Sequence, residues 1–161
     1  MRKGKPVYYW DSSVILAWIS NESRKHGEME GLAEIVRMVT NNDAIVITSV
    51  ATRTEVLKAD LSNDSQALFD RLFQRQNMEF KDITTPISDL ASEILKHYKQ
   101  ANQKNMSFAD AQHLATAIIF KVDEVHTFDE KHMISMSGNV AGHTLKICKP
   151  KGKQTELQLD E

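Results

Sequence analysis

The sequence predicts an α/β fold in three layers, in which two layers of helices cover a central, mainly parallel sheet. Short apolar or β-branched runs alternate along the chain with longer segments that repeat their apolar residues at helical spacing. One short run, Ala-Ile-Val-Ile at 44–47, is apolar throughout, as in a strand buried on both faces of a parallel sheet. Strands that alternate with helices form crossovers between parallel strands. The 161 residues fit one domain, which we place at 1–150, before a polar tail at 151–161.

The first half of the chain divides into two strands and four helices. The aromatic and β-branched run at 7–10 is typical of a strand, and the Asp-Ser-Ser that follows can cap a helix. Apolar residues at 32, 35, 36 and 39 form a helical stripe, which the Asn-Asn-Asp turn at 41–43 ends. In chain order we expect a strand at 7–10, helices at 14–19 and 31–39, a strand at 44–47, a helix after Ser49 and a helix at 62–76 with Leu68, Phe69 and Leu72 facing inward.

The second half repeats the alternation of strands and helices. Thr85-Pro86 is a helix start, with the hydroxyl as the cap and proline in the first turn. Ser107 can cap the next helix, whose apolar residues run from 111 to 119. In chain order we expect a strand at 78–83, helices at 85–98 and after Ser107, a strand at 122–128 and a last strand at 145–148.

Composition excludes several classes of protein. The lone cysteine, Cys148, provides neither a disulfide framework nor a cysteine-rich zinc site. No apolar run approaches the ~18 residues of a membrane span, and Asp11 interrupts the apolar run that follows the basic start. We therefore expect a cytoplasmic protein that contacts no membrane. The net charge of −2 gives no overall attraction to nucleic acid, so any such contact requires a local basic patch or a metal ion.

Four acidic residues stand where a parallel sheet gathers its functional groups. Asp11 follows the first strand, Asp129 follows the strand at 122–128, Glu55 lies just past the second strand, and Asp110 lies in the first turn of a helix. Ligand sites of such sheets lie beyond the carboxyl ends of the strands. A carboxylate beside an apolar element is costly unless something compensates it, and magnesium or manganese prefers oxygen ligands. These positions predict a divalent-metal site.

Each acid also has an ordinary structural explanation. Asp11 can cap the first helix, and Asp110 can interact with the dipole of its own helix. Asp129 can simply end a strand, and Glu55 can lie on the surface. One metal site explains all four positions together, so we favour it over four separate structural roles.

Four segments of the chain resemble the PIN-domain family, in particular the toxin nucleases of the VapBC type. The four acids occur in the order of that family, none is missing, and the resemblance covers residues 7–150. The third segment is the most specific and the segment around the glutamate is weak alone. The segments are Tyr-Trp-Asp-Ser-Ser-Val-Ile-Leu at 9–16, Thr-Arg-Thr-Glu-Val at 52–56, Ala-Asp-Ala-Gln-His-Leu-Ala-Thr-Ala at 109–117 and Thr-Phe-Asp at 127–129.

The resemblance implies a PIN-like fold and a phosphodiesterase that cleaves RNA with magnesium or manganese. Asp11 would be the central ligand, Glu55 and Asp110 would complete or orient the coordination shell, and Asp129 would lie at its outside. A metal-bound water would supply the nucleophile, and a second metal would stabilise the leaving oxygen. The family also implies a homodimer and, for a toxin of a type II toxin–antitoxin pair, an antitoxin protein as partner.

Four further residues are candidates for supporting roles. Ser12 and Thr127 carry hydroxyls that can orient the carboxylates. His113 lies three residues after Asp110 on the same helix face, where it can contact substrate or simply pack. Arg53 can lie at the rim of an RNA groove, although a solvated surface position is the commoner role of an arginine.

Other functions remain open at this point. A structure-specific DNA nuclease shares a related fold, but this chain is short and lacks room for insertions that grip DNA. A stand-alone RNA-processing nuclease or a non-catalytic RNA-binding PIN module fits the same acids. A phosphate-binding response domain requires a lysine after a late strand, and the helix-start segment at 109–117 fits that class poorly.

Overall fold

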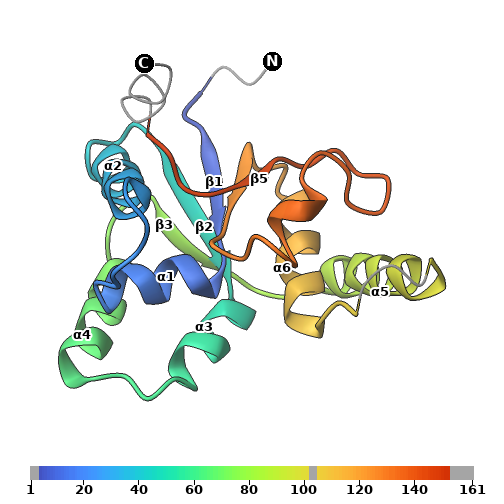
Figure 1. Ribbon diagram of the computed structural model, residues 1–161, viewed down its shortest axis with the longest axis horizontal. Coiled ribbons are helices and arrows are strands. Elements are labelled where there is room, and N and C mark those ends of the chain that lie inside the picture. Colours follow the sequence, from blue (N-terminus) through green and yellow to red (C-terminus); the bar gives the residue numbers. More distant parts are fainter. Residues whose placement is uncertain (1–3, 102–104, 153–161) are drawn as a thin grey trace.

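A parallel five-stranded sheet with strand order β3-β2-β1-β4-β5 forms the centre of the molecule (Figure 1). The computed structural model describes residues 4–101 and 105–152. All four strand pairs are parallel, with Tyr9 opposite Ile47 on one side and Val125 on the other. The predicted parallel sheet is thus confirmed. Its strands are β1 (Val7–Trp10), β2 (Ile45–Ser49), β3 (Met78–Lys81), β4 (Glu124–His126) and β5 (Ile147–Cys148).

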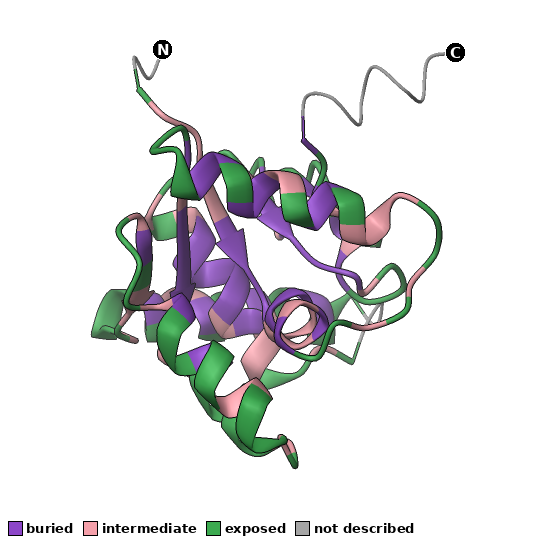
Figure 2. Cartoon of the chain, turned by 90° about the vertical axis from the view of Figure 1, so that its left-hand side faces the viewer, coloured by how far each residue is buried: buried purple, intermediate pink, exposed green. Residues whose placement is uncertain are grey.

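Helices cover both faces of this sheet and confirm the three layers (Figures 1 and 2). Alternate strand residues face opposite layers. Tyr9 packs with α5 and α6 in one apolar core, whereas Trp10 packs with α1, α2 and α4 in the other. The helices are α1 (Ser12–Ile19), α2 (Glu28–Thr40), α3 (Val50–Leu57), α4 (Asn63–Leu72), α5 (Thr85–Gln100) and α6 (Phe108–Ile119), with a short 3₁₀ helix at Ile134–Met136. None of the described helices is both long and apolar enough to cross a membrane.

Some boundaries and one inward position differ from those expected. Strand β4 ends at His126, because the Phe128 N–H bonds to a serine hydroxyl, Ser13 Oγ, instead of a neighbouring strand. Thr127 and Asp129 therefore both lie in the loop after β4, although the expected strand at 122–128 would have included Thr127. The expected inward position of Leu68 was wrong: this side chain is 41% exposed, because Phe69 and Leu72 occupy the buried stripe of α4.

The end of α4 and the N-cap of α5 also differ from the positions expected from the sequence. Helix α4 ends at Leu72 rather than at 76, and Phe73 beyond it stacks on Phe80 at 3.8 Å between ring centroids. Thr84, not Thr85, is the N-cap residue of α5, so the proline falls in the first turn as expected. Ser107 caps α6 as predicted, with its hydroxyl accepting from the Asp110 N–H.

The segment that follows β5 packs closely on α2. A Cβ atom on Gly31 would lie 2.3 Å from the Pro150 carbonyl oxygen, so only glycine fits at this point of the helix. Lys149 forms ion pairs with Glu28 at the start of α2 and with Glu130 in the loop after β4. This segment therefore ties the start of α2 to the loop that carries Asp129. The expected tail at 151–161 lies outside the described residues from 153 onward.

Candidate active site

Asp11 lies at the carboxyl end of β1, where the central strand of the sheet passes into α1. Its side chain accepts from the Val14 N–H at 3.3 Å, so the cap suggested by the sequence is present. Two hydroxyls also hold it: Ser13 donates to Oδ1 at 2.6 Å and Thr127 donates to Oδ2 at 2.5 Å. Only 6% of the residue is exposed. Asp11 is therefore a buried carboxylate whose orientation two hydroxyls and a backbone amide fix.

Three aspartates share one electrostatic environment at this edge. Burial raises the pKa of Asp11, and His113 together with the hydroxyls of Ser13 and Thr127 only partly opposes this. Burial also raises the pKa of Asp110, and the negative charges of Asp11 and Asp129 raise it further. The carboxylates are thus close enough to repel one another, which favours a bound cation or protonation.

Glu55 joins the site through His113. Its Oε1 lies 2.6 Å from His113 Nε2, and the Tyr9 hydroxyl lies 2.6 Å from His113 Nδ1. Burial alone would lower the pKa of His113, but Tyr9, Glu55 and Asp11 hold it well above its usual value. Burial likewise works to raise the pKa of Glu55, yet its bond to His113, with a further bond from Ser12, keeps that pKa low. His113 and Glu55 therefore form an ion pair between a buried ring and a half-buried carboxylate.

His113 is only 1% exposed, so of the two roles considered from the sequence, substrate contact and packing, the structure supports packing. Its place is between Tyr9 and Glu55, inside the wall of the site. Arg53, two residues before Glu55 on α3, is exposed, and its guanidinium lies 5.7 Å from the ring centroids of Phe69 and Phe80. A contact of Arg53 with substrate stays a prediction.

Changing Glu55 to glutamine is expected to lower the pKa of His113, because the ring would lose the carboxylate that stabilises its charge. In the wild type the ion pair stabilises the fold below the ordinary histidine pKa, and this contribution is lost as pH rises through the raised value. Nitrogen NMR of the His113 ring, with Glu93→Gln on the exposed face of α5 as control, measures the change. A ring that titrates identically in both variants would contradict the ion pair.

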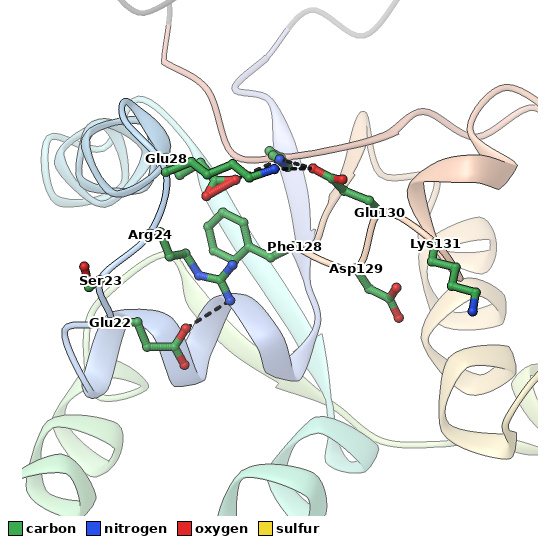
Figure 3. Close-up of a pocket in the computed structure, with 10 residues that line it drawn as sticks. Glu22, Ser23, Arg24, Glu28, Phe128, Asp129, Glu130 and Lys131 are labelled. Atoms are coloured by element: carbon green, nitrogen blue, oxygen red, sulfur yellow. Dashed lines mark hydrogen bonds and ion pairs between the residues drawn. The ribbon is translucent and has the colours of Figure 1, made fainter.

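Asp129 lies in the wall of the larger of two clefts beside the acids. Its backbone N–H donates to Thr127 Oγ1 at 3.0 Å, and its Oδ1 accepts from the His132 N–H at 2.9 Å. One cleft, of about 200 Å³, is lined by Asp110 and His132 together with Asn105, Met106 and Ser107. The other, of about 640 Å³, has Asp129 in its wall and extends toward the loop before α2 (Figure 3). Open space thus lies on both sides of the acidic residues.

The sequence did not identify Ser13 as a site residue. In the structure Ser13 Oγ donates to Asp11 and accepts from the Phe128 N–H at 3.0 Å, so it joins β1 to the loop after β4. Ser12, the serine named instead, bonds to Glu55. The Asp-Ser-Ser motif gave no means to choose between them, because the choice depends on which way α1 turns after its cap.

A second group of potential metal ligands proves to be a closed hydrogen-bond network. Among the described residues, Glu124, His126 and Cys148 have ligand atoms all within 4.8 Å of one another. His126 Nδ1 accepts from Trp10 Nε1 at 3.2 Å, and its Nε2 lies 2.8 Å from Glu124, so both ring nitrogens are occupied. Burial raises the pKa of the Cys148 thiol to about 12, so the free thiol stays protonated at neutral pH. A metal ion here would have to displace the bonds that His126 makes to Trp10 and Glu124.

The predicted acids fit a hard cation better. They offer only carboxylate oxygens, two of the aspartates have raised pKa values, and Asp110 and Asp129 each border open space. Magnesium keeps several waters and takes one or two carboxylates directly, so the acids need not touch one another to hold it. The donor set thus matches magnesium or manganese.

The fold and this edge define an α/β domain whose parallel strands lead into a buried acidic site. A model of the PIN domain matches residues 8–136, which is most of the chain. The chain therefore belongs to the PIN-domain family, whose members are generally nucleases. No curated protein matches it in sequence.

Solved structures show the same fold. VapBC2 from Rickettsia felis, bound to promoter DNA, matches with a TM-score of 0.66 and 14% identity, over 88% of this chain and 98% of that one. VapBC from Salmonella typhimurium has a TM-score of 0.65 and 14% identity, over the same shares. VapC20 from Mycobacterium tuberculosis is a toxin that cleaves the sarcin-ricin loop. It matches with a TM-score of 0.59 and 17% identity, over 78% of this chain and 92% of that one. At these identities the similarity shows the fold, and with it the PIN-like architecture predicted from the sequence.

Proposed function

We propose that this protein is an endoribonuclease that depends on magnesium or manganese. The observation that carries the proposal is the convergence of three aspartates at the carboxyl edge of a PIN-domain sheet, where burial and then the charges of Asp11 and Asp129 raise the pKa of Asp110. A cluster of one buried and two half-buried carboxylates is unfavourable in itself, so its presence favours a function that needs a cation. VapC20, which has the same fold, is a toxin that cleaves the sarcin-ricin loop, and this supports RNA as the proposed substrate.

Each side chain has a distinct part in this proposal. Asp11 and Asp110 would hold the ion, and Ser13 and Thr127 keep the Asp11 carboxylate in one orientation. Asp129 would contribute at the mouth of the larger cleft. The chemistry that the ion supplies when bound is a lower pKa for a coordinated water and neutralisation of charge on the scissile phosphate.

Glu55 has a restricted role in this scheme, because His113 already engages one of its oxygens at 2.6 Å. The ion pair fixes the Glu55 side chain beside the cluster and places one positive charge next to Asp11. We propose that Glu55 acts by orienting the coordination shell, with its remaining oxygen available to a metal-bound water.

Changing Asp110 to asparagine is expected to reduce RNA cleavage by at least about 100-fold, because the variant loses a ligand that neutralises the ion's charge. The assay uses a labelled single-stranded RNA with magnesium, with manganese or with chelator. The matched control is Asp64→Asn, since Asp64 also lies in the first turn of its helix, far along the chain in α4. If Asp110 served only its helix dipole, the two variants would behave alike and the ligand role would be wrong.

We further propose that the nuclease is the toxin of a type II pair. The support is that its structural neighbours include VapBC, FitAcB from Neisseria gonorrhoeae and a toxin-antitoxin complex from Klebsiella pneumoniae. An antitoxin protein and a homodimer then become the expected partners. Expression of the wild type in cells should stop growth, and the Asp110→Asn variant should not. Cleavage in vitro without growth arrest would favour a stand-alone RNA-processing enzyme. If the protein neither cleaved RNA nor arrested growth, a non-catalytic RNA-binding module would be favoured.

A further inference from the structure

The larger cleft beside Asp129 contains a cationic feature that the proposed chemistry does not use. One wall is the loop after β4, with Phe128, Asp129, Glu130 and Lys131, and the other is the loop between α1 and α2 (Figure 3). The second loop contributes Glu22, Ser23, Arg24 and Lys25. The volume of about 640 Å³ is in the range of pockets that bind ligands.

Arg24 is a half-buried cation of this cleft whose hydrogen-bonding capacity is only partly used. Its guanidinium carbon lies 3.9 Å from the centre of the Phe128 ring, and its Nη2 pairs with Glu22 at 3.0 Å. Its Nε is buried and has no hydrogen-bond partner among the described residues. A buried N–H without a partner is unfavourable, so an arginine held in this way calls for an explanation.

The other ions of the cleft are arranged differently. Lys149 pairs with both Glu28 and Glu130, and only 23% of its side chain is exposed, so it binds the two walls together. Lys25 is 79% exposed and lies 4.0 Å from Glu130, a distance at which such a surface pair contributes little. Arg24 differs from these two lysines, because its guanidinium is stacked on Phe128 and keeps one nitrogen, Nε, without a partner among the described residues.

Arg24 is connected to the acidic site through Phe128 and Ser13. Arg24 lies over Phe128, the Phe128 N–H donates to Ser13, and Ser13 donates to Asp11. The guanidinium thus has a fixed position relative to the carboxylates. Asp129 and Arg24 line the same cleft, so an RNA strand held at the acids has a path along it to the guanidinium.

We propose that the cleft binds the nucleotide adjacent to the scissile bond, with Arg24 donating hydrogen bonds to its phosphodiester group. This proposal rests on the proposed function and names a subsite for the same substrate. A guanidinium presents its donors in a planar fork that matches a phosphate, which an acceptor-rich RNA backbone supplies at regular intervals. The apolar part of the cleft is the single ring of Phe128, already covered by Arg24, so an apolar protein segment finds no anchor here.

The experiment compares Arg24→Gln with wild type in two measurements. In cleavage of single-stranded RNA, the Michaelis constant should rise about 10- to 100-fold with kcat little changed, as expected for loss of one charge-assisted contact. In binding of a short labelled RNA under chelation, the slope of log affinity against log salt should fall in magnitude by about 0.7, the value for one phosphate contact on a single strand.

Three variants separate a ligand contact from a structural role. Arg37→Gln removes an arginine that also pairs with a glutamate, Glu34, near the end of α2 that leads to the start of β2, and should change neither measurement. Glu22→Gln frees Arg24 from its competitor and should tighten RNA binding. If Arg24 only held the loop through Glu22, both Arg24→Gln and Glu22→Gln would weaken binding and lower the melting temperature together. Arg24→Lys keeps the charge, so it should restore the salt slope but only part of the affinity.

The outcomes also separate this proposal from the proposed function. An unchanged salt slope in a folded Arg24→Gln variant, with wild-type cleavage intact, would overturn the subsite alone. A wild type that never cleaves RNA would overturn the nuclease proposal, while the binding measurement would still decide on Arg24. If the Arg24→Gln variant lost a co-purifying acidic protein while its RNA binding stayed unchanged, the cleft would be assigned to that protein instead.

Discussion

An Asp11→Asn variant is expected to lose at least about 100-fold in RNA cleavage and to keep its fold. Asp11 is the buried carboxylate at the end of the central strand, and in the proposed site its neutralisation would remove the central ligand of the ion. Asparagine keeps one oxygen that can accept from Ser13 and the Val14 N–H. It also removes a buried charge whose pKa burial raises, so the metal-free variant should be about as stable as the wild type.

Circular dichroism and the cleavage assay test the two halves of this expectation separately. The control is Asp89→Asn, which neutralises an exposed aspartate on α5. Cleavage within a few fold of the wild type would remove Asp11 from the central role. A variant that fails to fold would show that the Thr127 hydroxyl bond to Oδ2 is a structural requirement, and Thr127→Val would then be the variant to compare.

The comparison of sequence with structure shows which parts of the site a linear pattern can predict. The parallel sheet followed from continuous apolar strands between helical stripes, and β1, β2, α1 and α6 lie at or within two residues of their expected starts. The positions of Asp11 and Asp110 followed from the caps of α1 and α6, which are local signals. These features depend on neighbours within a few residues, so the sequence carries them directly.

The parts that were not predicted depend on contacts between distant segments. His113 and Glu55 are 58 residues apart, and only the packing of α3 against α6 shows that they form an ion pair. The turn of Thr127 toward Asp11 spans 116 residues and ends β4 earlier than its apolar run suggested. A pattern of residue types cannot specify such pairs, because several hydroxyls and carboxylates compete for each position.

Saturating manganese is expected to raise the melting temperature by about 5–10 °C, and chelation should reverse the rise. The ion binds the folded cluster and has little to bind in the unfolded chain, so at a hundred times its dissociation constant it adds about 2.7 kcal/mol. Each kcal/mol moves the melting temperature of a domain of this size by about 2–4 °C. The quadruple variant, with Asp11, Asp110 and Asp129 changed to asparagine and Glu55 to glutamine, should not respond.

The pH dependence of this stabilisation has a definite sign. The pKa values of Asp11 and Asp110 are raised in the fold, so the metal-free protein loses stability as pH rises from the unfolded value, about 3.9, through the raised values. The ion binds the ionised carboxylates, so its effect should grow over the same window. Thermal unfolding at several pH values, with and without manganese, measures both trends. A shift that is equal in the quadruple variant would assign the binding to another site.

Gly31 packs so closely on Pro150 that adding one methyl group at position 31 would affect the acidic site, although Gly31 is not part of that site. Alanine at position 31 would have to displace the backbone that carries Lys149, because no flexible side chain is there to yield. Lys149 holds Glu130, the neighbour of Asp129, so the displacement would reach the loop that borders the acidic site. A replacement that alters no charge and touches no substrate would then reduce catalysis by misplacing a ligand. In random mutagenesis for inactive variants, Gly31 should therefore appear alongside the acids themselves.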